Sequence, residues 1–310
     1  MLESVREHKR NQLVEAKAVI AALEAEWSRM TPDFDPSFQT IAGNLYTVTA
    51  LAQERAARDA IDYVPEVLDE RGTATTPVAR VEPKAFTGVT GGGYSLMTEF
   101  KTSVIRMKQA VATGASVFVA LKVGRSHMLR VAQTAIADAG RGAERVSMAT
   151  NKCGGYVRVV TLPSCPKCLI LAGRVYGSEE AFKRHPRCDC GHVPFSERGD
   201  VRDDEVLNPS EVFDRLPARQ QDEIFGQADA EAIRNGADIY QVVNARRGMY
   251  TTADGFTYTR EGTTRRGLYQ LRQQTLGTPG RRRYTPEQIQ KVATSKDHYL
   301  QLLKTYGYIF

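Results

Sequence analysis

A segment rich in cysteine and histidine decides how this chain folds. It reads Cys165-Pro166-Lys167-Cys168, then 16 residues, then His185-Pro186-Arg187-Cys188-Asp189-Cys190-Gly191-His192. Two thiolates separated by two residues on a tight turn can bind one zinc ion, and a tetrahedral site then needs two further ligands from another part of the chain. We therefore predict a structural Zn²⁺ site within residues 153–195.

The second half of the segment offers more ligands than the site requires. The predicted metal ligands are Cys165, Cys168, His185, Cys188 and Cys190, with His192 as a further candidate, and the sequence leaves open which four bind. A closed structural site is favoured over a catalytic one, because catalytic zinc keeps one position open. The alternatives are a redox-active pair, a disulfide or unliganded thiols, but nothing in the sequence indicates export to an oxidising compartment.

The rest of the chain predicts an α+β fold that is predominantly helical. Helical patterns cover 2–30, the 30s to the 60s, 94–113, 126–139 and 218–235, and helix-start signals stand at Asn208 and Thr285. A strand is expected over 156–161, whereas the short apolar run 117–123 fits either a strand or a helix. We expect an N-terminal helical arm (1–72), a linker (73–93), an α+β domain (94–240) and a basic C-terminal region (241–310).

Composition indicates a folded protein that works without export or membrane insertion. The 310 residues are 42% hydrophobic and 25% charged, which is enough to bury a core. The longest apolar run is far shorter than the roughly 18 residues of a membrane span, and the charged N-terminus lacks a secretory apolar core.

Positive charge is concentrated in the last quarter of the chain. Residues 241–310 hold 12 Lys and Arg against 4 Asp and Glu, so the remaining residues carry a slight negative excess. Because guanidinium groups match phosphate oxygens and aromatic rings can stack on bases, this Arg- and Tyr-rich region indicates nucleic-acid contact. An anchor for an acidic protein is the alternative. The predicted nucleic-acid-binding residues are Arg246, Arg247, Arg265, Arg266, Arg281, Arg282 and Arg283.

The cysteine segment also resembles a known family. The pattern Cys165-x-x-Cys168, Gly173, His185-Pro186-x-Cys188-x-Cys190 is similar to the signature of MuF-like minor capsid proteins of tailed phages, although many relatives carry one upstream cysteine rather than two. Asn244–Tyr250, Glu261–Gly267 and the closing residues 285–309 resemble minor capsid proteins of actinobacterial phages. The likeness is specific over about 150–310.

The resemblance implies a MuF-like module and a protein of the virion. Such a protein is assembled in the host cytoplasm and lies inside the capsid near the portal, where it acts in head morphogenesis and procapsid assembly. Its implied partners are the portal protein, the major capsid or scaffold protein, and packaged double-stranded DNA contacted through its backbone. No membrane partner is implied.

Because neighbouring phage genes often encode capsid maturation proteases, a prohead protease is the alternative function. Ser95, Ser103 or Ser147 could approach His127, but no Gly-x-Ser-x-Gly elbow is present. We therefore expect His127 to be structural and the protein to be non-enzymatic.

Overall fold

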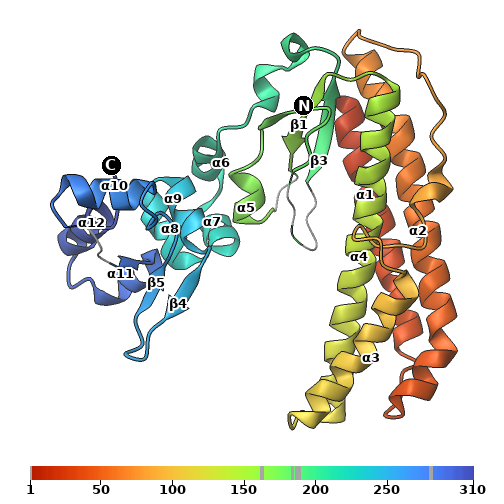
Figure 1. Cartoon of the computed structure of the whole chain (residues 1–310), viewed down its shortest axis with the longest axis horizontal. Helices are drawn as coiled ribbons and strands as arrows, with labels where there is room; N and C mark the ends of the chain where they lie inside the picture. Colours follow the sequence, from red (N-terminus) through yellow and green to blue (C-terminus); the bar gives the residue numbers. More distant parts are fainter. Residues whose placement is uncertain (1, 161–163, 183–184, 186–189, 279–281) are drawn as a thin grey trace. The chain divides into compact units, whose positions relative to one another are not determined.

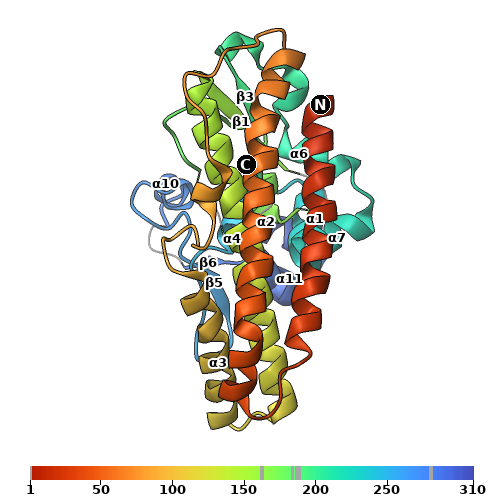
Figure 2. The ribbon, with the colours of Figure 1, turned by 90° about the vertical axis from the view of Figure 1, so that its right-hand side faces the viewer.

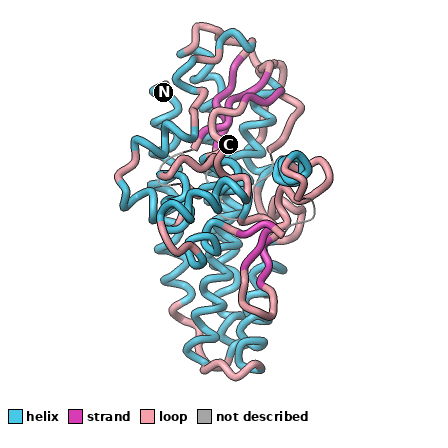
Figure 3. The backbone as a smooth tube through the Cα atoms, turned by 90° about the vertical axis from the view of Figure 1, so that its left-hand side faces the viewer, coloured by secondary structure: helices cyan, strands magenta, loops and turns pink. Residues whose placement is uncertain are grey.

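The computed structural model describes residues 2–160, 164–182, 185, 190–278 and 282–310. In these residues the chain forms twelve α-helices and two three-stranded antiparallel sheets (Figures 1 and 3). This confirms the prediction of an α+β fold that is predominantly helical. No helix in the described ranges is both long and apolar enough to cross a membrane.

The chain divides into two compact units. The first comprises Met1–Thr161 and Gly173–Val206, and the second comprises Leu162–Ala172 and Leu207–Phe310. This division differs from the expected boundaries at 72, 93 and 240. The N-terminal helices are not a separate arm, because they share one hydrophobic core with the helices that follow the expected linker.

Four long helices form most of the first unit. They are α1 (Glu3–Trp27), α2 (Phe34–Glu70), α3 (Leu96–Ala112) and α4 (Val117–Thr150). The long helices α2 and α4 pack against each other, α1 packs mainly on α2, and α3 packs mainly on α4 (Figure 2). Apolar residues at helical spacing, such as Ile41, Leu45 and Ala52, are fully buried in the shared core. Gly124 lets α4 approach α3 and α1 closely, since a Cβ at this position would lie 2.6 Å from Met107 and 2.8 Å from Trp27.

One run in this unit that the sequence left open between strand and helix is helical in the structure. The run 117–123 begins α4, because the Ser116 side chain accepts a hydrogen bond from the backbone N–H of Val119 and caps the helix. Pro65 lies inside α2 and does not end it. Tertiary burial of the residues around Pro65 therefore outweighs the hydrogen bond that proline cannot donate.

The first sheet packs at one end of the helices. It has the order β2-β1-β3, with β1 at Gly155–Val159, β2 at Val175–Gly177 and β3 at Gly191–Phe195. The strand predicted at 156–161 is therefore confirmed as β1, which pairs Val157 with Val193 of β3. A second core lies between this sheet and the ends of α1, α2 and α4. Short 3-10 turns at Pro83–Phe86, Arg198–Asp200 and Asp203–Glu205 complete the unit.

The second unit consists of short helices and a small sheet. Its helices are α5 (Pro166–Leu169), α6 (Pro209–Arg215), α7 (Ala218–Phe225), α8 (Gln227–Arg234), α9 (Ile239–Ala245), α10 (Leu268–Thr275), α11 (Pro286–Val292) and α12 (Lys296–Thr305). The second sheet has the order β4-β5-β6, formed by Met249–Thr251, Thr257–Thr259 and Arg283–Tyr284.

Local signals in this unit explain where its helices begin and end. The Thr285 hydroxyl accepts a hydrogen bond from the N–H of Gln288 at 3.2 Å, which confirms the helix start expected there. The single helix expected over 218–235 is wrong, because Gly226 adopts φ +85° and separates α7 from α8.

Candidate functional site

The turn that carries the first two cysteines is formed as the spacing predicts. Cys165 precedes α5, and the backbone N–H of Cys168 donates to the carbonyl oxygen of Cys165 at 3.0 Å. The turn brings the two sulfur atoms within 4.8 Å of each other, with Cys168 buried. Cys165 and Cys168, both in the second unit, are two donor groups that could share one metal ion, whereas His185 belongs to the first unit.

The remaining predicted ligands have different surroundings. Cys188 lies outside the described residues. The sulfur of Cys190, which is buried beside β3, accepts a hydrogen bond from the Arg158 guanidinium at 3.2 Å. Arg158 is itself 2% exposed and stacks on the ring of Phe182, with 4.1 Å between the guanidinium carbon and the ring centroid. Its positive charge would stabilise a thiolate at Cys190, and the sequence gives no signal for this contact.

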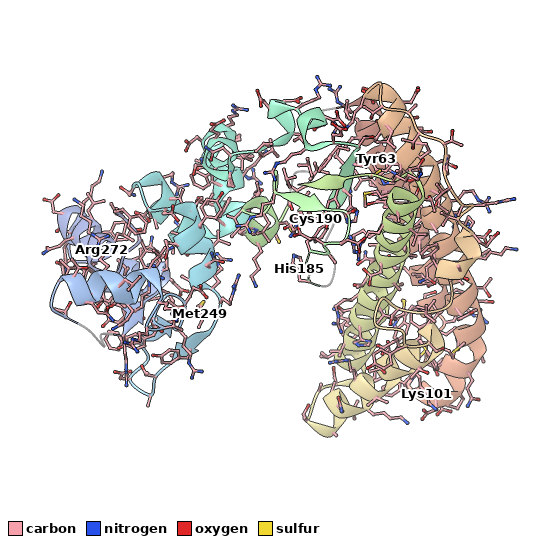
Figure 4. The ribbon with its side chains drawn as sticks, turned by 45° about the horizontal axis from the view of Figure 1, so that its top comes forward. Tyr63, Lys101, His185, Cys190, Met249 and Arg272 are labelled. Atoms are coloured by element: carbon pink, nitrogen blue, oxygen red, sulfur yellow. The ribbon has the colours of Figure 1, made fainter. Side chains whose placement is uncertain are left out.

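His192 takes part in a buried network that sequence reasoning missed. The carboxylate of Glu144 lies between two imidazoles: one oxygen is 3.1 Å from His8 Nε2, and the other is hydrogen-bonded to His192 Nδ1. The opposite nitrogen of His8 is 2.6 Å from the carboxylate of Asp59. The ring of His8 stacks on Tyr63, whose hydroxyl donates to the backbone carbonyl of His192 (2.8 Å; Figure 4 labels Tyr63).

Burial and charge have opposite effects on the pKa values in this network. Burial opposes ionisation of Glu144, but the charges and hydrogen bonds of His192 and His8 outweigh it and hold the Glu144 pKa well below its usual value. Burial also opposes ionisation of His8, which lowers its pKa. The hydrogen bonds to Asp59 and Glu144 more than compensate, so the His8 pKa is raised. The network therefore joins α1, α2, α4 and β3 through the ionised Glu144 carboxylate and its hydrogen bonds.

A serine and a histidine do meet in the helical core. Ser103 Oγ on α3 is 3.0 Å from His127 Nδ1 on α4, as one of the alternatives considered for a protease requires. Ser103 is 0% exposed, however, and His127 is 6% exposed, so a polypeptide substrate has no access to the hydroxyl in this structure. Burial, with the nearby charges of Arg106 and Arg130, lowers the pKa of His127 to about 4.

The predicted nucleic-acid-binding arginines have unequal access to solvent. Arg247, Arg265, Arg266 and Arg282 are exposed. Arg246 is also exposed, but its Nε donates to the buried carboxylate of Asp229 at 2.6 Å, so part of its hydrogen-bonding capacity is used within the protein. Arg281 lies outside the described residues.

The prediction for Arg283 is wrong. This arginine is 0% exposed, and its guanidinium donates to three backbone carbonyls and to the side chain of Gln241. It also stacks on Tyr308, with 4.3 Å between the guanidinium carbon and the ring centroid. Since its donor groups are directed into the protein, Arg283 stabilises the second unit and cannot reach a phosphate.

Tyrosines and arginines share one face of the second sheet. The strand register places Tyr250 opposite Tyr258 and Tyr258 opposite Tyr284, so the three rings form a row across β4, β5 and β6. Arg260 and Arg282, which flank β5 and β6, lie over the rings of Tyr250 and Tyr258. We call Tyr250, Tyr258, Tyr284, Arg260 and Arg282 the Tyr–Arg face. Sequence analysis predicted a Tyr- and Arg-rich binding region but did not name Arg260, which directly follows β5.

Comparison of the chain with models of protein families, with curated proteins and with solved structures gives no match.

Proposed function

We propose that this chain is a non-enzymatic structural protein whose second unit contacts the phosphates of nucleic acid. The observation that supports this most directly is the exposure of Arg247, Arg265, Arg266 and Arg282 in a region with a positive surplus of eight charges. One exposed guanidinium group can bind two phosphate oxygens at once, and each such contact releases counterions from the nucleic acid.

The affinity of the full chain for a duplex of about 30 base pairs tests this proposal. Replacing both Arg265 and Arg266 with glutamine should weaken duplex binding, because two phosphate contacts are lost. Replacement of Arg6 and Arg10, an exposed pair on α1 in the first unit, is the matched control. Equal loss of affinity in both double variants would show that the effect is one of net charge and not of this surface.

The sequence resemblance supports a more specific role for the same protein. We propose a minor capsid protein that lies inside the head of a tailed phage near the portal, contacts the portal and the capsid or scaffold protein, and meets packaged double-stranded DNA. Mass spectrometry of purified virions tests this role. The chain should be present in few copies and protected from external protease until the heads are opened, whereas its absence from virions would exclude the role.

We further propose that the cysteine segment binds a structural Zn²⁺ ion. Cys165 and Cys168 are two of its ligands, and Cys188, Cys190 and His185 are the candidates for the others. Support comes from the sulfur pair on the α5 turn and from the preference of zinc for thiolate and imidazole ligands. When bound, the ion would stabilise the fold around the turn.

A prohead protease is the second candidate, and the contact between Ser103 and His127 is the observation that favours it. The burial of Ser103 argues against it. Coexpression with capsid and scaffold proteins, followed by intact-mass measurement, separates the two functions. Under our proposal no cleavage depends on this chain, whereas cleavage that disappears in both Ser103→Ala and His127→Ala would establish the protease.

A further inference from the structure

We propose that the Tyr–Arg face binds single-stranded nucleic acid, with an unpaired base stacked at Tyr250 and phosphates bound by Arg260 and Arg282. This inference rests on the proposed nucleic-acid function and names the ligand class for one surface of the second unit.

The aromatic row crosses the whole sheet, from the edge strand β4 through the central strand β5 to the other edge strand β6. Ring centroids are 5.7 Å apart between Tyr250 and Tyr258, and 5.1 Å apart between Tyr258 and Tyr284. Tyr258 is buried in the middle of the row, while Tyr250 is half-buried on the edge strand β4, whose first residue, Met249, is labelled in Figure 4. Tyr284 is also half-buried, but its ring packs against Tyr306, with 4.7 Å between the ring centroids. Tyr250 is therefore the ring of the row that a base can reach from solvent at the β4 edge.

The two arginines are held against these rings. The guanidinium carbon of Arg260 lies 5.4 Å from the ring centroid of Tyr250, and that of Arg282 lies 5.4 Å from the centroid of Tyr258. Both arginines are exposed. Stacking on an aromatic ring orients a guanidinium at low entropic cost and leaves its N–H edge available, which is the arrangement that phosphate recognition requires.

The combination of rings and arginines favours unpaired nucleotides over a duplex. In a duplex the faces of the bases are covered by their neighbours, so an aromatic side chain gains little from them. In a single strand the base can stack on tyrosine or on the guanidinium plane while the adjacent phosphate meets a second arginine. Arg265 and Arg266 lie outside the Tyr–Arg face and can bind the phosphates of a single strand or of a duplex.

Fluorescence anisotropy with the full chain tests this inference. The probes are labelled single strands of thymidine or uridine nucleotides, about 15 long, and a duplex of the same length. Tyr250→Leu removes the accessible π-face, Tyr250→Phe retains it, and Arg260→Gln combined with Arg282→Gln removes the two phosphate contacts. Arg265→Gln combined with Arg266→Gln is the matched control, with the same change in charge.

We expect Tyr250→Leu to weaken single-strand binding at least about fivefold, which is the lower end of base–aromatic stacking, while Tyr250→Phe binds nearly as well as the wild type. The Arg260/Arg282 variant should weaken single-strand binding more than the Arg265/Arg266 control does, and Tyr250→Leu should leave duplex binding nearly unchanged. Unchanged melting temperatures would show that each variant is folded.

Two results would overturn the inference, and they differ in what they say about the proposed function. If single strand and duplex bind the wild type equally and Tyr250→Leu has no effect, the Tyr–Arg face is not a single-strand site, but phosphate contact by the second unit stands. If neither single strand nor duplex binds at low salt, the proposed nucleic-acid function fails as well.

Discussion

His8 Nε2 on α1 lies 3.1 Å from the carboxylate of Glu144 on α4, although 136 positions separate the two residues in the sequence. The same carboxylate is bonded to His192 on β3, so one buried acid joins the first helix, the last helix and the sheet of the first unit. An ionised carboxylate in such a place is stable only while its partners are present.

Replacement of Glu144 by glutamine should therefore destabilise the protein strongly. The variant leaves two buried imidazoles facing an uncharged amide, and we expect the free energy of unfolding to fall by about 3 kcal/mol or more. Urea denaturation measures the change. Glu7→Gln, which alters an exposed acid on α1, is the control and should cost less than about 0.5 kcal/mol. A loss at Glu144 no larger than that at Glu7 would contradict the structural role of the network.

The depressed pKa of His127 predicts a dependence of stability on pH. Its pKa is about 4 in the folded protein and near 6.5 when unfolded, so the unfolded state takes up the proton first as the pH falls. The contribution of neutral His127 is complete above about pH 6.5 and is lost between there and about pH 4.

We expect the free energy of unfolding to fall by about 2 kcal/mol over this range, because solvent screening reduces the full effect of the pKa shift. Urea denaturation of wild type and His127→Gln across this range gives the difference in stability. The difference should shift in favour of the variant as the pH falls, and a difference that stays constant with pH would show that His127 is not held neutral.

The cysteine pair predicts a defined metal content. Purified protein should contain about one Zn²⁺ per chain, and Cys165→Ser or Cys168→Ser should lower both the zinc content and the melting temperature, because structural zinc contributes on the order of 10 kcal/mol. Elemental analysis with a thermal melt is the measurement. Cys153→Ser, a buried cysteine of the first unit, should retain its zinc. Full metal content in Cys168→Ser would exclude this residue as a ligand.

Two adjacent arginines should respond differently to the same substitution. Arg283→Gln removes a buried guanidinium that donates to backbone carbonyls of Glu261, Tyr306 and Gly307, so we expect a loss of about 3 kcal/mol in unfolding free energy. Arg282→Gln changes an exposed side chain and should cost less than about 0.5 kcal/mol. Denaturation of the two variants measures both values. Similar losses in the two would contradict the different placement of these neighbours.

The sequence predicted those features that depend on local signals. Residues close together in the chain set the caps at Thr285 and Asn208, the turn at Cys165 and the strand at 156–161. These features can therefore be predicted from the sequence without knowledge of the fold. The same reasoning left the run 117–123 undecided, because a short apolar run has no periodicity that separates strand from helix and only its cap and its packing decide.

The features that the sequence did not reveal depend on contacts between distant segments. Glu144 and His192 are ordinary residues of a helix and a strand until β3 brings them together, and the network leaves no sequence motif. Arg283 belongs to a run of three arginines that suggests a uniform basic surface, yet strand alternation turns its side chain into the core while Arg282 faces solvent. Because β6 is only two residues long, its alternation leaves no pattern in the sequence from which this could be predicted.

The salt dependence of duplex binding by the full chain tests the central claim most directly. If exposed arginines of the second unit contact phosphates, the logarithm of the binding constant should fall linearly with the logarithm of salt concentration, with about 0.9 units of slope for each neutralised phosphate. The slope should become shallower by about 1 to 2 units in the Arg265→Gln, Arg266→Gln double variant. Affinity that does not change with salt, or no binding at low salt, would contradict the account.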